Sequence, residues 1–193
     1  MWLTSWLRSR LRSNPSERRR RDGAAHPRAT FRPRLEVLED RWLPAQIGLT
    51  VSSLADSGPG TLRAAILTAD AGSPSDKFTV GFTVTGTIDL QSPLPELNNT
   101  IAIEGPGASS ITVERATGAS FGTAIVTVDA GKTASLSGLT VANGNAGGIV
   151  NNGMLTVTAS TVSGNTAQFG GGINNGIGGN LTVTGSMVSG NTA

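Results

Sequence analysis

The sequence lacks two residue types altogether and has little of several others. It contains no cysteine and no tyrosine, and its 193 residues include only three tryptophans and five phenylalanines. The absence of cysteine excludes a disulfide framework, and the scarcity of aromatic side chains leaves valine, isoleucine, leucine and alanine to form a core. No apolar run approaches the roughly 18–20 residues that a membrane-spanning helix needs.

Charge is distributed unevenly along the chain. Residues 1–41 carry eleven arginines against five acidic side chains, whereas residues 42–193 carry four basic side chains against eight acidic ones. Residues 133–193 contain no charged side chain at all. The sequence pI of 9.9 therefore describes the arginine-rich start of the chain. The weakly acidic remainder offers no second basic patch, and we expect no nucleic-acid partner.

Residues 1–46 form an arginine-rich leader. Its composition has no packed-core pattern, so a solvated tail is the simplest interpretation, and we expect residues 1 to about 34 to be dispensable for folding. A nucleic-acid arm is an alternative, because arginine blocks neutralise phosphates. A secretion signal would need an apolar stretch after the arginines, and none follows them.

A compact motif, RLEVLEDRWLPA, closes the leader at residues 34–45. It resembles the planctomycete-type N-terminal sorting motif. The residues that carry the match are Leu35, Glu36, Leu38, Glu39, Arg41 and Leu43. The resemblance implies an extracellular or cell-envelope location on the bacterial surface. A short amphipathic helix would explain the same residues without any sorting role.

Residues 47–75 predict an N-terminal cap made of one strand and one short helix. IGLTV is strand-like, a turn follows at residues 56–60, and Thr61 can cap a helix. We expect this helix over residues 61–71, because apolar side chains recur there at helical spacing. They are Leu62, Ala65, Ile66 and Ala69. Such a unit can cover the apolar cross-section at the end of a repeat array.

Residues 76–193 consist of short strand-like segments rich in valine, isoleucine and threonine, separated by turns, which predicts an all-β domain. The segment LTVTASTVSGNTA at residues 155–167 returns as LTVTGSMVSGNTA at residues 181–193. Other near-copies are spaced by 21 residues (TV at 140 and 161) and by 23 (VNNG at 150 and INNG at 173). This period predicts one turn of a parallel β-helix, with coils stacked about 4.8 Å apart. A β-propeller or a β-sandwich is the structural alternative.

The copies also predict which side chains stack inside the coil. The expected interior pairs are Leu155 over Leu181, Val157 over Val183 and Val162 over Val188, with these valines buried. The expected exterior residues are Thr156, Thr158, Thr182 and Thr184. We expect Asn151 and Asn152 over Asn174 and Asn175 at corners, where asparagine accepts a positive φ. The three extra residues of the last 26-residue spacing are assigned to the turn IGGN at residues 177–180.

The pattern GGI-NNG-LTVT-S-VSGNTA within residues 138–193 resembles the repeats of right-handed β-helix proteins, including chlamydial polymorphic outer-membrane proteins and other bacterial surface proteins. SGPGTLRAAI at residues 57–66 resembles the CSLREA-type module that precedes such repeats. That match is carried by Gly60, Leu62, Arg63, Ala65 and Ile66, although the cysteine of the module is missing and Ala64 replaces its acid. The resemblance implies a right-handed parallel β-helix, a pectin-lyase-like solenoid. Polysaccharide-active enzymes share this fold, so the fold alone does not assign a function.

Motifs for catalysis or metal binding are weak. GASFG at residues 118–122 fits G-x-S-x-G, but a strand-like segment follows it and the only histidine is His26. GKT at residues 131–133 lacks the earlier glycine of a phosphate loop, since Val126 stands there. The glycine-rich residues 170–180 lack the aspartate of a calcium site.

Glycoside hydrolysis needs two carboxylates about 5–9.5 Å apart, and the acids of residues 76–193 are spread singly along the sequence. They are Asp76, Asp89, Glu96, Glu104, Glu114 and Asp129. With Arg115 and Lys132 these acids could meet on one face, but a solvated rim is the simpler interpretation. We therefore expect no catalytic, cofactor-binding or metal-binding residues.

The sequence favours a non-catalytic exported or cell-surface β-helix repeat protein with a structural or adhesive role. Its threonine-, serine- and asparagine-rich exterior suits contact with cell-wall or surface carbohydrate. The alternative is a polysaccharide-active β-helix enzyme, a lyase or hydrolase, or a fragment of one. Because the last coil would expose an apolar cross-section, we expect a longer protein or end-to-end association with other coils.

Overall fold

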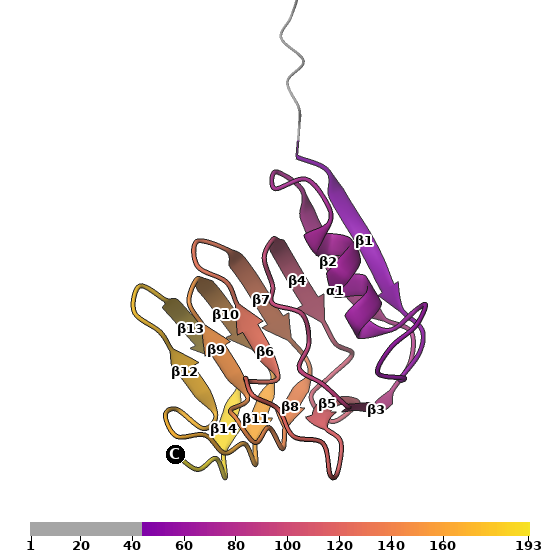
Figure 1. Cartoon of the computed structure of the whole chain (residues 1–193). Helices are drawn as coiled ribbons and strands as arrows, with labels where there is room; N and C mark the ends of the chain where they lie inside the picture. Colours follow the sequence, from indigo (N-terminus) through magenta and orange to yellow (C-terminus); the bar gives the residue numbers. More distant parts are fainter. Residues whose placement is uncertain (1–43) are drawn as a thin grey trace, which may run out of the picture. The chain divides into compact units, whose positions relative to one another are not determined.

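The computed structural model describes residues 44–193, in which three parallel sheets wind around a common interior (Figure 1). The six-stranded sheet contains β1 (Gln46–Val51), β2 (Lys77–Phe82), β4 (Thr100–Glu104), β7 (Thr133–Ser137), β10 (Met154–Thr158) and β13 (Asn180–Thr184), in that order. The five-stranded sheet contains β3 (Gly86–Leu90), β5 (Ile111–Arg115), β8 (Thr140–Ala142), β11 (Thr161–Ser163) and β14 (Met187–Ser189). The three-stranded sheet contains β6 (Val126–Val128), β9 (Ile149–Asn151) and β12 (Ile173–Asn175).

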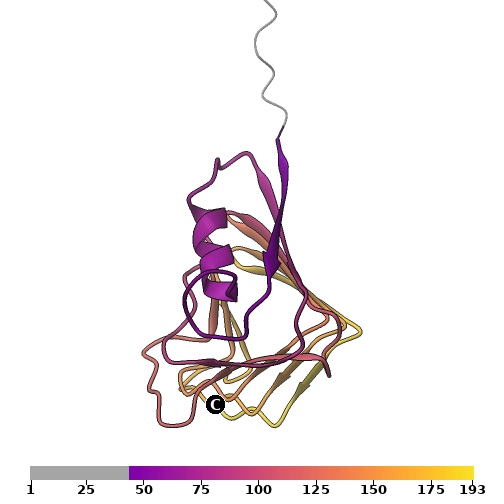
Figure 2. The same cartoon turned by 90° about the vertical axis from the view of Figure 1, so that its right-hand side faces the viewer.

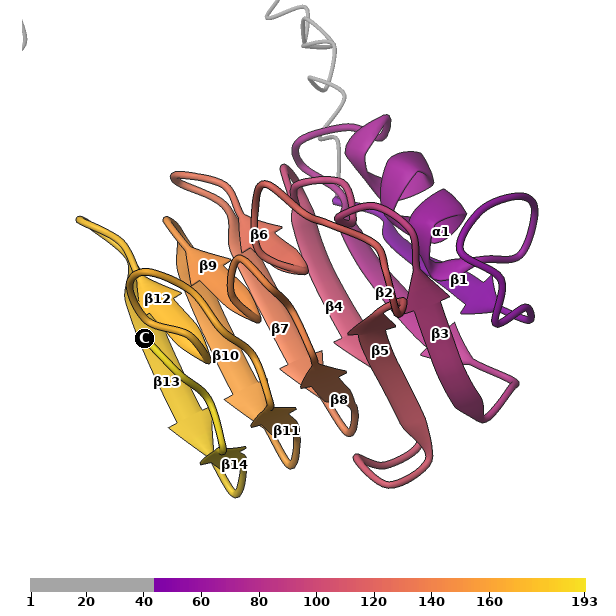
Figure 3. The same cartoon turned by 60° about the horizontal axis from the view of Figure 1, so that its bottom comes forward.

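The chain visits these sheets in turn and makes about five turns of a solenoid. Each strand pairs in parallel with its counterpart in the next coil, as β7 does with β10 and β10 with β13 (Figure 3). The predicted fold class, an all-β parallel β-helix, is confirmed. The predicted leader and sorting motif lie outside the residues that the structure describes, apart from residues 44–46.

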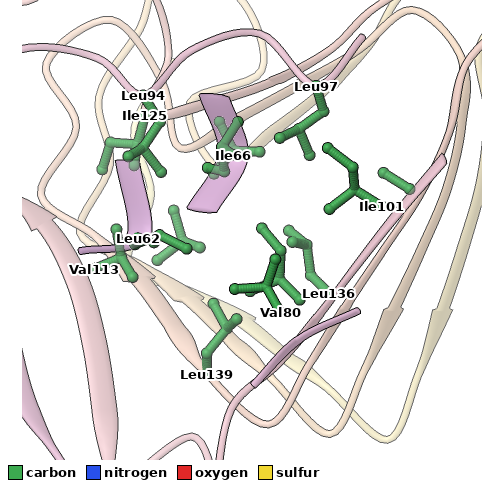
Figure 4. Packing of buried hydrophobic residues seen from close by; sticks show 14 of the residues in the cluster. Leu62, Ile66, Val80, Leu94, Leu97, Ile101, Val113, Ile125, Leu136 and Leu139 are labelled. Atoms are coloured by element: carbon green, nitrogen blue, oxygen red, sulfur yellow. The ribbon is translucent and has the colours of Figure 1, made fainter. Parts of the chain in front are cut away.

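Alternation along each strand fills the interior. In β10, Leu155 and Val157 are buried while Thr156 between them is exposed. Stacked apolar side chains from successive coils form one continuous hydrophobic cluster, part of which is drawn in Figure 4. A single coil cannot bury these side chains alone, and each valine, leucine or isoleucine that becomes fully buried contributes about 1.5–3 kcal/mol.

The single helix of the described region, α1 (Leu62–Asp70), connects the parallel strands β1 and β2. It begins where predicted, because the Thr61 side chain accepts a hydrogen bond from the backbone N–H of Ala64 at 3.2 Å. The four residues of the predicted apolar stripe are all buried. The helix lies across part of the open end of the coil (Figure 2), and Leu62 and Ile66 point into the interior (Figure 4).

Arg63 fastens this helix to its surroundings. Its guanidinium forms an ion pair with Asp56 and donates hydrogen bonds to the carbonyl oxygens of Ser92 and Pro93. The helix is therefore tied both to the turn that precedes it and to the loop after β3. The predicted strand at residue 47 belongs to β1, which extends the six-stranded sheet by pairing with β2.

The predicted stacking of the last two coils is confirmed in its register. Leu181 pairs with Leu155, Val183 with Val157 and Val188 with Val162. Val157 and Val162 are 0% exposed, but Val183 and Val188 are 42% and 49% exposed, so their predicted burial is wrong. The reason is that β13 and β14 lie at the edges of their sheets, where no described strand covers them. Of the predicted exterior threonines, Thr156, Thr182 and Thr184 are exposed and Thr158 is partly exposed.

The predicted corner asparagines are misplaced by one residue. Asn175, rather than Asn174, pairs with Asn151, so the spacing here is 24 residues and not 23. Both asparagines lie in short strands, and the non-glycine residues with positive φ in the described region are Asn143 and Ala159. Asn151 is buried, and the cost of burying its amide is offset by hydrogen bonds, one of them donated to the side-chain oxygen of Asn175 at 2.6 Å. The 26-residue spacing has five residues more than the 21-residue spacing. Three of them lie in loop 164–172 and two in turn 176–179, so the turn does not hold three additional residues as predicted.

Candidate functional site

A hollow opens at the carboxyl ends of β5, β8 and β11, three neighbouring strands of the five-stranded sheet. Different loop lengths produce it. The loops that follow these strands run over residues 116–125, 143–148 and 164–172, so that a six-residue loop lies between loops of ten and nine residues. The short loop forms the floor and its longer neighbours form two walls. Because the walls belong to coils two steps apart, their backbones are separated by about 10 Å.

The hollow has a volume of about 250 Å³ and a polar lining. Its lining residues are Glu114, Arg115, Thr117, Gly118, Asn143, Gly144, Asn145, Gly164 and Thr166. They supply a carboxylate, a guanidinium, two amides and two hydroxyls. Gly118 and Gly164 are exposed and leave backbone uncovered, which allows a ligand to approach the main chain closely.

Arg115 holds one wall of the hollow to the floor. Its guanidinium donates to the carbonyl oxygens of Ala116 at 3.2 Å and Ala119 at 2.7 Å, both in the longest loop. Its Nε atom donates to the carbonyl oxygen of Asn143 at 2.9 Å. These bonds engage the Nε and Nη1 atoms of the guanidinium, so Arg115 acts as a structural brace.

The Glu114 carboxylate stands at the edge of the floor. Its Oε2 atom accepts a hydrogen bond of 2.6 Å from the amide nitrogen of Asn143, which fixes the orientation of both groups. Glu114 also pairs in register with Asp89 on the adjacent strand. The buried residues Ile88 and Val113 precede these acids, so both carboxylates project from the outer face of the sheet.

Residues of the next coil hold the floor of the hollow, loop 143–148, in place by hydrogen bonds. The backbone N–H of Gly144 donates to the Oδ1 atom of the buried Asn165 at 2.8 Å, and the N–H of Thr166 donates to the carbonyl oxygen of Gly144 at 2.7 Å. Asn145 accepts a bond of 3.0 Å from the N–H of Phe121 in the opposite wall. Floor and walls are therefore joined by hydrogen bonds before any ligand arrives.

The structure brings together only some of the titratable residues that the sequence analysis named. Glu114 and Arg115 line the hollow and Asp89 pairs in register with Glu114, so these three residues meet on one face of the coil. By contrast, Asp76 accepts from the N–H of Ala45, and Asp129 accepts from the N–H of the residue that follows it. Among the carboxyls of residues 44–193, the one with a resolved pKa shift is Asp70, at the end of α1, where burial raises the pKa.

The weak motifs have simple structural positions. Ser120 lies in the wall loop 116–125, which leads into strand β6 and not into the helix that a nucleophile elbow requires. Lys132 lies in the turn between β6 and β7, where Gly131 has a φ of +73°. The glycine-rich residues 170–180 contain strand β12 and the turn that follows it.

A second depression, of about 210 Å³, lies on the outer face of the six-stranded sheet. It crosses strands β1, β2, β4, β7 and β10, and short side chains such as those of Ala102 and Ser135 form its centre. Its lining contains one charged group, Lys77, and no carboxylate. This surface offers less hydrogen-bonding chemistry than the hollow beside Glu114.

Within residues 44–193, no three histidine, cysteine or acidic side chains gather closely enough to hold a metal ion. No helix in the same region has the length and apolar character needed to cross a membrane. The chain matches no family model, and comparisons with curated proteins and with solved structures find no match either. The fold alone therefore assigns the structural class of the protein: the chain is a parallel β-helix repeat protein.

Proposed function

We propose that the chain is a non-catalytic, exported or cell-surface β-helix protein with a structural or adhesive role. The observation that carries this proposal is the outer surface of the coil. On the five-stranded sheet, Thr87, Thr112, Thr140 and Thr161 stack in register and place one hydroxyl on each successive coil. The coils over residues 133–193 carry no charge. A rigid, hydroxyl-rich surface that is neutral over residues 133–193 suits contact with cell-wall or surface carbohydrate.

Sequence resemblance supports the location. The motif at residues 34–45 resembles a planctomycete-type sorting signal, and the repeats resemble those of polymorphic outer-membrane proteins. The stretch at residues 57–66 resembles a CSLREA-type cap, and Arg63 and the buried Leu62 and Ile66 give that stretch a clear packing role at the end of the coil.

The experiment that tests this location is antibody labelling of intact and permeabilised cells of the source organism. The surface proposal expects labelling of intact cells and loss of that labelling when protease is added outside. Deleting residues 34–45 should retain the protein inside, whereas deleting an equal length upstream, residues 14–25, should not. Labelling that appears only after permeabilisation contradicts the proposal.

A second candidate function rests on the registered pair Asp89 and Glu114. Adjacent parallel strands place their backbones about 4.8 Å apart, and a retaining glycosidase needs two carboxyl groups separated by about 5–5.5 Å. Incubating the chain with polysaccharides and measuring new reducing ends would test this alternative. Hydrolysis that is abolished in both Asp89→Asn and Glu114→Gln would replace the adhesive proposal with an enzymatic one.

A further inference from the structure

We propose that the hollow above loop 143–148 binds one sugar ring of an uncharged glycan. This inference rests on the proposed function in taking a carbohydrate as the partner, and it adds the position of the site and the chemical class of the sugar.

The dimensions of the hollow select a small ligand. Its volume of about 250 Å³ lies just below the 300–1,000 Å³ typical of pockets for drug-sized molecules. The walls are two coils apart, so the slot admits a single ring or a single extended chain, but not a second macromolecular surface. Both ends of a glycan chain can leave the slot, because the hollow is open to solvent.

The lining groups suit a polyhydroxylated ligand. A carboxylate has two acceptor oxygens, and each asparagine amide offers both donors and an acceptor. At Glu114, the bond from Asn143 occupies Oε2 and holds the group in place, which leaves the second oxygen to accept from a sugar hydroxyl. Thr117 and Thr166 add one hydroxyl from each of the two walls.

Asn145 gives the site a donor that can change partners. Its side-chain oxygen is held by the N–H of Phe121, but its nitrogen lies 3.4 Å from the Ser120 hydroxyl, which is a long and weak hydrogen bond. A sugar hydroxyl placed closer to that nitrogen would form a stronger bond without moving the backbone.

The charges exclude acidic glycans. Glu114 lies beside Asp89, so a uronate or sulfate group in the hollow would meet two negative charges. The neighbouring cation, Arg115, compensates one of these two charges, and its Nε and Nη1 atoms already donate to the carbonyl oxygens of Ala116, Ala119 and Asn143. Binding an anion through those two nitrogen atoms would break the brace between wall and floor. The site therefore favours neutral hexoses.

The test measures binding of the full chain to soluble glycans by saturation-transfer NMR and by calorimetry. The neutral probes are laminarin, galactomannan and xyloglucan, and the acidic probes are polygalacturonate and alginate. We expect saturation transfer from the protein to one or more neutral probes and none to the acidic ones. Preferential binding of the acidic probes, or no binding of any neutral probe, overturns the inference.

Two matched pairs of variants locate the binding. Glu114→Gln keeps the shape of the side chain and removes its charge, and it should weaken binding about tenfold, since hydrogen bonds to charged groups are the stronger ones. Glu104→Gln makes the same change at an exposed position of β4, in the six-stranded sheet and outside the hollow, and should change the affinity less than about twofold. Thr166→Val removes a wall hydroxyl and should weaken binding about fivefold, whereas Thr182→Val, at an exposed position of β13, should not.

Equal effects within either pair would show that glycans bind elsewhere and would overturn the assignment of the hollow. The thermal melting curve of each variant confirms that the coil is intact. The labelling of intact cells is independent of this result. A surface-exposed protein that binds no neutral glycan refutes the inference and leaves the surface role standing, whereas a glycan-binding protein found only inside cells refutes the surface role.

Discussion

Replacing Asn165 with alanine should destabilise the coil more than any other polar substitution that we consider. Asn165 is fully buried at the turn after β11. Its side-chain oxygen accepts from the N–H of Gly144, and its nitrogen donates to the carbonyl oxygens of Val141 and Ser163 and to the side chain of Asn191. One amide therefore connects three successive coils.

The magnitude follows from what alanine leaves behind. Each lost hydrogen bond removes a net 0.5–1.5 kcal/mol, and a buried donor without a partner costs about 1–3 kcal/mol. The N–H of Gly144 would become such a donor, because Gly144 is buried. Together these effects should lower the free energy of unfolding by about 3–5 kcal/mol, a large part of the 5–15 kcal/mol typical of a domain.

Urea unfolding followed by circular dichroism measures this loss, and Asn191→Ala is the matched control. Asn191 occupies the equivalent turn 26 residues later and donates to the carbonyl oxygen of Val162, but it is only partly buried. Because solvent can replace its lost bonds, its substitution should cost about 1 kcal/mol. A loss below about 1 kcal/mol for Asn165→Ala, or equal losses at both positions, would refute the argument from buried hydrogen bonds.

Three further predictions concern the core, the helix and the contact between coils. Val157→Asp should cost several kcal/mol because the charge enters the interior, whereas Val183→Asp, at a 42% exposed position, should cost little; similar thermal melts would contradict the difference in burial. Burial raises the folded-state pKa of Asp70, so the stability that this group contributes is fully present below its unfolded pKa and is lost as pH rises through the folded pKa. Asp70→Asn should therefore raise stability at neutral pH and flatten the dependence of the urea midpoint on pH, and a variant less stable than wild type at neutral pH would contradict this. Gly105→Ala should lower the urea midpoint, since its new Cβ would lie 2.2 Å from the carbonyl oxygen of Gly138, while Gly81→Ala meets nothing within 4 Å and should not.

The sequence predicts the coil because two independent patterns agree. Alternation places Leu155 and Val157 on one face of a strand, and the near-copy at residues 181–193 shows what stacks on that face. The helix is equally clear, since Thr61 and the apolar stripe define its start and its buried side. These features depend on local spacing, which a single sequence contains in full.

The predicted register near the asparagines was wrong because the alignment with the most identical residues is not the alignment in which the strands pair. Aligning VNNG with INNG matches three identical residues, but the backbone pairs Ile149 with Ile173 and shifts the alignment by one residue. Three-residue strands such as β9 and β12 contain too little alternation to reveal that shift. The exposure of Val183 was missed for a different reason, because burial of a stacked residue depends on a coil on each side.

The spacings contain a partial signal for one wall of the hollow, once the strand pairing corrects them. The spacing from Val141 to Val162 is 21 residues, but the spacing from Ile149 to Ile173 is 24, which places three additional residues in loop 164–172. The sequence contains no such signal for the pairing of Asp89 with Glu114, because the early coils are not copies of one another. Their proximity follows from the sheet and cannot be derived from composition.

The short floor loop between two longer ones also indicates how proteins of this kind can diversify. Loop closure becomes only about 0.6 kcal/mol less favourable when a loop doubles in length, and the buried side chains that stack from coil to coil come mainly from the strands. The three loops are themselves joined between coils, as by the hydrogen bonds from the N–H of Gly144 to Asn165 and from the N–H of Thr166 to Gly144. An insertion or deletion in residues 143–148 that keeps these bonds would therefore close or reshape the hollow while the buried columns of the coil stay intact. Natural selection can thus alter ligand preference by small length changes in one repeat.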